Sequence, residues 1–353
     1  MDTAPLRRAL ATLANRQSLT EDQTTEVFGV VMSGEATPAQ IGALLMGLRA
    51  KGETADEIAG ATRALRAVMV RVNTMAEHRP LVDTCGTGGG TVPTFNISTV
   101  AAFVAAGAGA VVPKHGNRSY TTRCGSADVL EALGIRIVLD ATAATRLLSE
   151  ARIVFLFAPS FHPAMKHVGP IRRELGTPSV MNLVGPLANP AGVTRQVIGV
   201  AEADRAPVVA DALVRLGAEH ALVVHGRVGM DEISPHGVTD VWEVKDGAVR
   251  KWEIDPERFR LGIRDVTALQ GGEPAANAER FERILGGGNG SASKADVDAA
   301  GLAAVLLNAG AAIYVAGIAS SLAEGIGRAR EVVASGAARA ALDRLRKATA
   351  SIS

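Results

Sequence analysis

Residues 83–99 read DTCGTGGGTVPTFNIST, and they decide which kind of fold and site the chain can form. Four glycines fall between residues 86 and 90, and an apolar helix is predicted to begin near Val100. Glycine lets backbone N–H groups approach an anion closely, and a helix start adds its own unpaired N–H groups. The stretch therefore predicts a loop that holds a phosphate group, although a tight turn explains the glycines alone equally well.

Short apolar runs that end in glycine, proline or polar residues follow from about residue 80. They predict β-strands at residues 111–112, 135–138, 153–157, 197–200 and 221–224. Helical patterns over residues 142–150 and 204–216 lie between them, and this alternation is typical of a largely parallel sheet covered by helices. Residues 240–254, with Lys245-Asp246-Gly247 at their middle, predict a β-hairpin.

The first 75 residues predict helices only. Three threonines, each followed three residues later by glutamine or glutamate, predict helix starts: Thr20 with Gln23, Thr37 with Gln40, and Thr54 with Glu57. We therefore expect an α/β protein with a small all-helical N-terminal domain over residues 1–75, joined by a segment near 168–190. A larger α/β domain over residues 76–353, with a mainly parallel central sheet, follows it.

The composition of the chain argues against a nucleic-acid-binding or membrane protein. The 353 residues include 37 basic and 36 acidic side chains, so no strong positive field is available to hold nucleic acid or an anionic membrane. Two cysteines and the lack of a signal peptide predict a cytoplasmic protein. The most apolar run, residues 302–318, is too short for a membrane span and predicts a buried helix, and residues 286–291 predict a mobile loop.

A second chemical segment, KHGNRSYTT at residues 114–122, directly follows a predicted strand. It contains two cations, Lys114 and Arg118, and four hydroxyl groups within nine residues. Such groups at the carboxyl end of a strand favour a phosphate or diphosphate ligand, while a solvated basic loop is the alternative. Residues 125–128, GSAD, are expected to open the next helix.

Two further segments carry charged groups. Asp231 and Glu232 follow the strand predicted at 221–224, where adjacent carboxylates can hold Mg²⁺ together with substrate phosphate and water. His162 and Arg172, in residues 161–176, can pair with an acidic ligand. Alone, the acidic pair is weak evidence, because most Asp-Glu pairs are solvated at the surface, and a surface helix explains residues 161–176 equally well.

In this order, the segments resemble the anthranilate phosphoribosyltransferase family. The matching motifs span nearly the whole chain and are GTGG at 86–89, FNIST at 95–99, KHGNR at 114–118, GSAD at 125–128, NLVGPLANP at 182–190 and MDE at 230–232. The resemblance implies a helical and an α/β domain, a homodimer formed through the helical domains, and a need for 5-phosphoribosyl 1-diphosphate (PRPP) and Mg²⁺.

The resemblance also implies a role for particular residues. Those expected to bind PRPP are Gly86, Gly89, Gly90, Thr94, Asn96, Ile97, Ser98, Thr99, Lys114, His115, Gly116, Asn117, Arg118, Ser119, Thr121, Thr122 and Ser126. Those expected to hold Mg²⁺ are Ser98, Asp231 and Glu232. The aromatic acid is expected near Gly86, Asn117, Arg172, His115, His162 and Gly185. The expected catalytic residues are Lys114, His115, Asn117 and Arg172.

The implied reaction transfers the 5-phosphoribosyl group of PRPP to the amine of anthranilate, releasing diphosphate, as a step of tryptophan biosynthesis. The substrates are then small molecules, and neither nucleic acid nor membrane is an expected partner. The main departure from the family pattern is Gly90, where the family usually has aspartate, followed by Thr91 in place of glycine.

Two other functions stay open from the sequence. A pyrimidine nucleoside phosphorylase-like enzyme would share the fold, but its Lys-His-Ser-Thr-Gly-Gly type of loop is absent. A non-catalytic paralogue that binds nucleic acid is kept open by Gly90. The net charge of +1 argues against it, because such proteins carry an excess of lysine and arginine.

Overall fold

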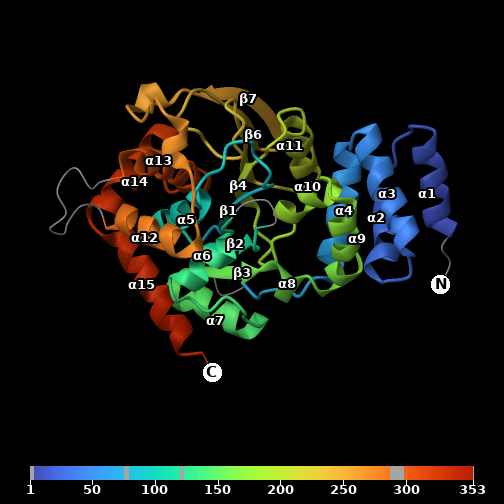
Figure 1. Cartoon of the computed structure of the whole chain (residues 1–353), viewed down its shortest axis with the longest axis horizontal. Coiled ribbons are helices and arrows are strands. Elements are labelled where there is room, and N and C mark those ends of the chain that lie inside the picture. The colour runs from blue at the N-terminus through green and yellow to red at the C-terminus, as the bar shows by residue number, and fades with distance from the viewer. Residues whose placement is uncertain (1–3, 75–78, 120–122, 287–297, 353) are drawn as a thin grey trace.

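The computed structural model describes residues 4–74, 79–119, 123–286 and 298–352, and its first part consists of helices. These are α1 (Ala4–Ala14), α2 (Glu21–Met32), α3 (Pro38–Lys51) and α4 (Ala55–Val68). Each of the three predicted caps forms a capping box, in which the threonine hydroxyl and the glutamine or glutamate side chain bind each other's backbone N–H groups. Figure 1 shows the four helices gathered at one end of the molecule.

The strands form a mainly parallel sheet, as predicted. β1 (Val82–Gly86), β4 (Arg195–Gly199) and β5 (His220–Gly226) are parallel neighbours, and β6 (Thr239–Lys245) and β7 (Ala248–Ile254) extend the sheet with antiparallel pairs. β2 (Val112–Gly116) and β3 (Ile153–Phe157) form a separate parallel pair. Leu81 makes a single parallel bridge to Val111, so this pair continues the sheet beyond β1.

Helices cover the sheet and follow its strands. In the α/β part they are α5 (Ile97–Gly107), α6 (Ser126–Ala132), α7 (Ala141–Ala151), α8 (Ala158–Phe161), α9 (Gly169–Leu175), α10 (Val180–Leu187), α11 (Ala206–Arg215), α12 (Pro274–Leu285), α13 (Ala299–Val315), α14 (Leu322–Ala334) and α15 (Ala337–Ala350). Short 3₁₀ helices span Pro163–His167, Pro256–Phe259 and Val266–Leu269. α13 is the buried helix predicted at 302–318, and no helix in the described ranges is long and apolar enough to cross a membrane.

Strand side chains alternate between two hydrophobic clusters, one on each face of the sheet. In β5, Leu222 and Val224 pack with residues of α5, α12 and α13. Ala221 and Val223 pack with α10 and α11, and this second cluster continues into α2, α3 and α4. The N-terminal helices are therefore joined to the sheet by a shared apolar core, and α9 and α10, in the predicted joining segment, pack against α3 and α4.

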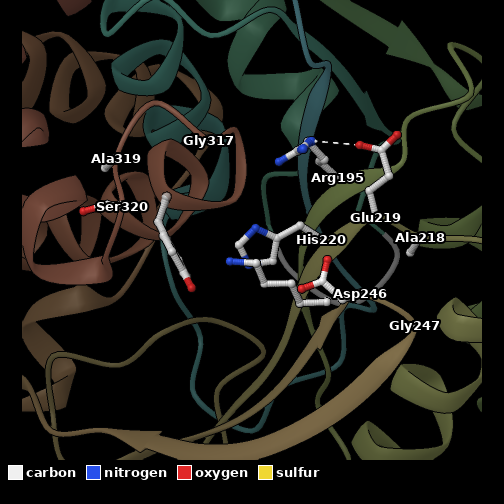
Figure 2. A pocket seen from close by; sticks show the side chains of 11 residues that line it. Arg195, Ala218, Glu219, His220, Asp246, Gly247, Gly317, Ala319 and Ser320 are labelled. Atoms are coloured by element: carbon white, nitrogen blue, oxygen red, sulfur yellow. Dashed lines mark hydrogen bonds and ion pairs between the residues drawn. The ribbon is translucent and has the colours of Figure 1, made fainter.

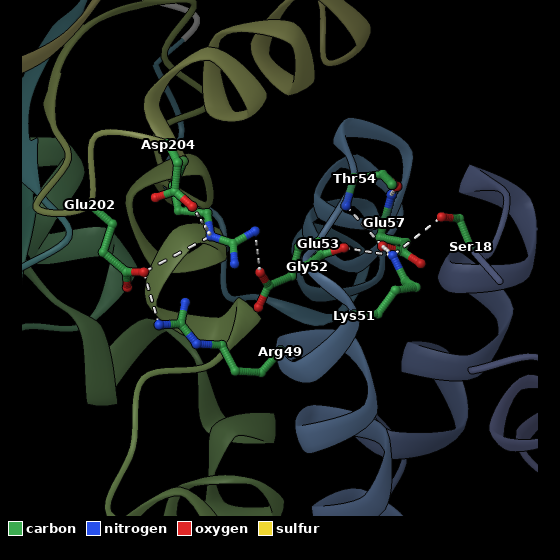
Figure 3. A network of polar contacts seen from close by, with 10 residues as sticks. Ser18, Arg49, Lys51, Gly52, Glu53, Thr54, Glu57, Glu202 and Asp204 are labelled. Carbon is green, nitrogen blue, oxygen red and sulfur yellow. Dashed lines mark hydrogen bonds and ion pairs between the residues drawn. The ribbon is translucent and has the colours of Figure 1, made fainter. Parts of the chain in front are cut away.

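Ion pairs also cross from the helical part to the sheet. The Glu53 carboxylate, after α3, is fully buried and lies 3.1 Å from Nη1 of Arg205. Arg49 donates to Glu202 at 2.8 Å (Figure 3). Breaking a buried pair by removing one partner typically costs about 3 to 5 kcal/mol, because the remaining charge stays buried. This network therefore fixes the segment after β4 relative to the helical part.

Four predictions of local structure need correction or stay untested. Residues 135–138 form no strand: Ile135 and Ile137 are buried, but Val138 is 59% exposed and no neighbouring strand pairs with the segment. The helix expected near Val100 begins at Ile97. The strand at 111–112 begins one residue later and runs on to Gly116, and residues 287–291 of the predicted loop lie outside the described residues. The hairpin is confirmed, with Asp246 and Gly247 both at positive φ in its turn.

Candidate active site

The predicted site segments meet at one edge of the sheet. β1, β2, β3, β4 and β5 all run in the same direction, so the loops that follow them emerge at their shared carboxyl edge. The glycine loop follows β1, the basic loop follows β2, His162 follows β3, and the acidic pair follows β5. This shared edge is where open α/β sheets bind ligands.

Lys114 connects three of these segments from a buried position. Its ammonium group donates to the carbonyl of Thr84 in β1, and to Oγ of Ser98 at 3.3 Å in the first turn of α5. Thr84 in turn donates through its hydroxyl to the carbonyl of Ser98 at 3.0 Å. Lys114 therefore lies in the middle of β2 with its charge directed to the start of α5, as a group that binds anions there would need.

The acidic pair faces the same place. Oε1 of Glu232 accepts a hydrogen bond from the Ser98 backbone N–H at 3.1 Å, and Oδ2 of Asp231 accepts one from Gly88 at 2.8 Å. The three residues predicted to hold Mg²⁺ are thus linked to the glycine loop and the start of α5. A Cβ on Gly199 would lie 1.7 Å from the Asp231 carbonyl oxygen, so this approach requires glycine in β4.

Burial makes the charged forms of three acidic side chains at this edge unfavourable. Burial, together with the Asp231 charge, raises the pKa of Glu232 to about 8, and the Lys114 ammonium only partly opposes this. Burial likewise raises the pKa of Asp231. Burial raises the pKa of Asp83 to about 6, against the effects of Lys114 and a hydrogen bond from Asn189. A divalent cation would favour the charged carboxylates of Asp231 and Glu232, so these residues fit Mg²⁺.

The glycine loop is fastened to the acidic loop on the side where Gly90 departs from the family pattern. Thr91 donates to the Gly229 carbonyl through its backbone N–H at 2.9 Å and through its hydroxyl at 3.4 Å. A Cβ on Gly90 would lie 3.0 Å from both Oδ1 of Asp231 and the Gly229 carbonyl. Thr91 therefore supplies a contact that glycine could not, and the backbone at Gly90 fills the space beside Asp231.

The basic loop is held by α6. The Asn117 carbonyl accepts from the Ser126 hydroxyl at 3.1 Å, and Gly125 allows the loop to return so closely that a Cβ there would meet Ser119 at 2.3 Å. Arg118, predicted to bind substrate, is paired with Asp128 and Glu131 of α6, each at 2.6 Å. Thr121 and Thr122 lie outside the described residues.

Asn96, predicted to bind substrate, has its side-chain amide occupied by other segments. It donates to the Cys124 carbonyl at 3.0 Å and accepts from Asn277 of α12 at 3.0 Å. Asn96 therefore ties the start of α5 to the basic loop. Burial raises the pKa of the Cys124 thiol to about 11 and raises that of Cys85, which agrees with packing roles for both cysteines.

Other predicted PRPP residues differ in what they can offer. The Ile97 side chain is completely buried in the core, so only its main chain could meet a ligand. Thr99 is also buried, and its hydroxyl has no hydrogen-bond partner among the described residues. Gly89 lies in the loop at a φ of +84°, and Thr94 precedes the buried Phe95. Gly86 and Gly116 end their strands, and a Cβ on either would meet a site side chain: Asp231 at 2.6 Å or Ser126 at 2.5 Å.

His115 and His162, both predicted to lie near the aromatic acid, contact each other directly. Their Nε2 atoms are 3.2 Å apart, and the Gly185 carbonyl of α10 also bonds His115. Burial lowers the pKa of His115 to about 3 and of His162 to about 4, so both rings are neutral at pH 7. The two rings can therefore form hydrogen bonds with a ligand, but they are poorly suited to accept a proton at pH 7.

We expect acid to destabilise the chain through this pair. An unfolded histidine takes up a proton near pH 6.5, whereas the folded rings resist protonation until far lower pH, so stability falls as pH drops below 6.5. Replacing His162 with glutamine keeps a donor and removes one titrating ring, which should lessen this loss by up to about 1.4 kcal/mol per pH unit. Urea midpoints between pH 7 and 5 measure it, and an unchanged pH dependence would refute it.

Arg172, in α9, contacts the first turn of α10. Its Nη2 donates to Oδ1 of Asn182 at 3.2 Å, and Asn182 begins the turn of α10 that leads to Gly185. The structure thus connects Arg172 with the helix that faces the histidine pair.

A hollow of about 460 Å³ lies at the opposite edge of the sheet, at the first residues of β4 and β5 (Figure 2). His220 and Tyr314 on its wall both bind the Glu243 carboxylate, at 2.9 and 2.7 Å. Burial raises the pKa of Glu243, but these hydrogen bonds outweigh it and hold the pKa below its usual value. None of the residues predicted for the site lines this hollow.

Known proteins match both parts of the chain. Residues 7–69 match the glycosyl transferase family, helical bundle domain, and residues 78–339 match the glycosyl transferase family, a/b domain. The chain is 47% identical over 336 residues to the anthranilate phosphoribosyltransferase of Xanthobacter autotrophicus, covering 95% of this chain and 94% of the relative. It is 49% identical over 339 residues to that of Rubrobacter xylanophilus, covering 96% of each.

The chain belongs to the anthranilate phosphoribosyltransferase family. The solved anthranilate phosphoribosyltransferase of Thermus thermophilus is 41% identical, with a TM-score of 0.88 over 97% of this chain and 99% of that one. The Saccharomyces cerevisiae anthranilate phosphoribosyltransferase in complex with PRPP and Mg has a TM-score of 0.89 at 27% identity, covering 99% of each chain. The predicted family and fold class are confirmed.

Several supporting residues were absent from the predicted site of this anthranilate phosphoribosyltransferase family member. Asp83, fully buried in β1, accepts from the His115 backbone at 3.2 Å and from Asn189 at 2.8 Å. Gly199 and Asn277 support Asp231 and Asn96 as described above. An aspartate beside a glycine loop was a usable signal for Asp83, whereas nothing local marks Gly199 or Asn277.

Proposed function

We propose that the carboxyl edge of the sheet carries out the family reaction. The chain transfers the 5-phosphoribosyl group from PRPP to the anthranilate amine, giving N-(5-phosphoribosyl)anthranilate and diphosphate for tryptophan biosynthesis. The observation that carries this proposal is the meeting of Lys114, Ser98 and Glu232 beside the glycine loop. It brings a buried cation and a buried acidic side chain to the start of a helix, an arrangement suited to a magnesium diphosphate.

Mg²⁺ is the cofactor, and a relative's structure was solved in complex with PRPP and Mg. We propose that Asp231, Glu232 and the Ser98 hydroxyl hold it. Its charge would stabilise the negative charge that builds up on the departing diphosphate. No group of three or more histidine, cysteine or acidic side chains in the described parts of the chain could hold a metal ion alone. Phosphate and water ligands would therefore complete the site.

The chain's own residues position the reactants. Lys114 neutralises the leaving group, and the backbone of Gly86, Gly89 and Gly90 lies against the ligand without side chains. Holding the amine about 3 to 3.5 Å from C1 of the ribose can lower the barrier by about 7 to 11 kcal/mol in such a transfer. A pKa of about 3 makes His115 a weak base, so we assign it and His162 to holding the aromatic acid. No covalent enzyme intermediate is needed.

Arg172 is expected to pair with the anthranilate carboxylate. Replacing Arg172 with alanine should raise the KM for anthranilate at least about tenfold, because a charge-assisted pair is worth about 1.5 to 3 kcal/mol. The KM for PRPP should change less than threefold. Steady-state kinetics with each substrate varied in turn measure both constants, and equal effects on the two would contradict the assignment.

The assembly and location of the chain are also proposals. We propose a cytoplasmic homodimer formed through the helical domains. Light scattering of the purified protein should then give twice the chain mass of 36.4 kDa.

The direct test of the activity follows anthranilate fluorescence after mixing the purified protein with anthranilate, PRPP and Mg²⁺. We expect a decay that stops when a chelator removes the metal and is absent without PRPP. A signal that stays constant under all conditions would overturn the proposed function. Phosphate-dependent cleavage of a pyrimidine nucleoside, or a shift of mixed DNA in a gel, would then support one of the two alternatives.

A further inference from the structure

Asn308 is a polar side chain in the middle of an otherwise apolar buried helix. In α13 it is only 3% exposed, and its neighbours in the chain are the buried residues Leu307 and Ala309. A buried amide costs free energy unless all its hydrogen bonds are made. We therefore expect the Asn308 amide to be fully hydrogen-bonded to other groups of the fold.

The main partner of this amide is the residue that follows the acidic pair. Oδ1 of Asn308 accepts from the Ile233 backbone N–H at 3.0 Å, and Nδ2 donates to the Ile233 carbonyl at 2.9 Å. Nδ2 also donates to the Ala304 carbonyl at 2.9 Å, one turn earlier in α13. The amide thus forms a closed ring with one residue of the acidic loop and is itself fixed by its own helix.

The geometry points to Asn308 as a positioning residue for the metal carboxylates. Ile233 follows Glu232 directly in the chain. The hydrogen bonds between Asn308 and the Ile233 backbone therefore also fix the position of the Glu232 backbone. On the opposite side, Gly88 and Thr91 bind the same loop. The acidic loop is held between α13 and the glycine loop, and Asn308 supplies the only side-chain bonds that the structure gives the Ile233 backbone among the described residues. This inference rests on the proposed function, because it gives Asp231 and Glu232 their metal role.

Asn308→Leu tests the inference, because leucine is close in size and leaves both Ile233 groups unpaired. Mn²⁺ serves as the probe, with its binding to the full chain in the presence of PRPP followed by electron paramagnetic resonance. We expect the Mn²⁺ concentration at half-saturation to rise at least about tenfold, the effect of about 1.4 kcal/mol. The KM for anthranilate should stay within twofold.

Leu306→Ala is the matched control. Leu306 is buried in the same helix, but residues two positions apart point to different sides of a helix. This variant should lower the thermal midpoint without shifting the Mn²⁺ midpoint. An equal Mn²⁺ shift in Leu306→Ala, or an unchanged one in Asn308→Leu, would overturn the inference.

Asn308→Ser keeps the inference testable if the leucine variant does not fold. A serine hydroxyl can replace at most part of the ring, so we expect a Mn²⁺ shift of at least threefold and faster amide exchange at residues 229–234. Normal exchange and an unchanged Mn²⁺ midpoint would refute the positioning role. If the wild-type chain binds Mn²⁺ and PRPP but leaves anthranilate unconverted, the proposed function fails, while these shifts would still support the role of Asn308.

Discussion

Replacing Gly199 with alanine is expected to remove most of the activity while the chain still folds. The new Cβ would lie 1.7 Å from the Asp231 carbonyl oxygen, a backbone atom that no side-chain rotation can move away. Gly199 itself is fixed between β1 and β5 by its pairing with Gly86 and Val224. The acidic loop must therefore shift, and a displacement of about 1 Å at a reacting group can cost about 100-fold in rate.

The measurement is kcat/KM for PRPP, together with the thermal midpoint. Overpacking of this kind usually costs about 1 to 3 kcal/mol of stability, which a chain of this size can tolerate. Gly327→Ala is the control, because a Cβ built at that position in α14 meets no atom within 4 Å beyond its chain neighbours and its own helix backbone. A Gly199→Ala enzyme within threefold of the wild type would show that the close approach is dispensable.

Replacing Lys114 with methionine is expected to have the second large effect. Methionine retains the apolar stem but removes the charge that opposes the raised pKa of both Asp83 and Glu232. Removing one preorganised donor from a site where charge develops typically costs about 100- to 1000-fold in kcat. We therefore expect kcat/KM for PRPP to fall by at least about 100-fold at pH 7.

The activity of Lys114→Met should also depend on pH, increasing as the pH rises. Without Lys114, the pKa of Glu232 rises further above about 8, so fewer molecules carry the carboxylate at pH 7. Part of the loss should therefore be recovered between pH 7 and 9, beyond any change in the wild type. Lys347→Met, at an exposed position near the end of α15, should leave both rate and pH dependence unchanged. A Lys114→Met enzyme with wild-type kcat/KM at pH 7 would contradict the role of the charge.

Features that depend on residues close together in the sequence could be predicted. The helix starts at Thr20, Thr37 and Thr54 were right, because a capping box uses residues only three positions apart. The strand at residues 135–138 was wrong, because a strand needs a partner that the local pattern does not contain. The edge location of the site followed from strand direction alone, once the strands were placed.

Side-chain partners were harder to predict than side-chain types. Asn308 and Ile233 are 75 residues apart in the chain, so only the folded sheet reveals their contact. Arg118 was an obvious anion-binding candidate, yet its pair with Asp128 depends on how α6 returns toward the basic loop. The roles assigned to the individual site residues remain predictions for the experiments above.

The contact between Thr91 and Gly229 limits how this enzyme can be redesigned. Gly90, Thr91 and Gly229 occupy one small space: a Cβ on Gly229 would lie 2.0 Å from the Thr91 hydroxyl, and one on Gly90 would lie 3.0 Å from the Gly229 carbonyl. A side chain that suits one of these positions therefore depends on what occupies the other two. Mutant libraries that sample the three positions one at a time would discard combinations that function only together, so the three codons belong in a single combinatorial set.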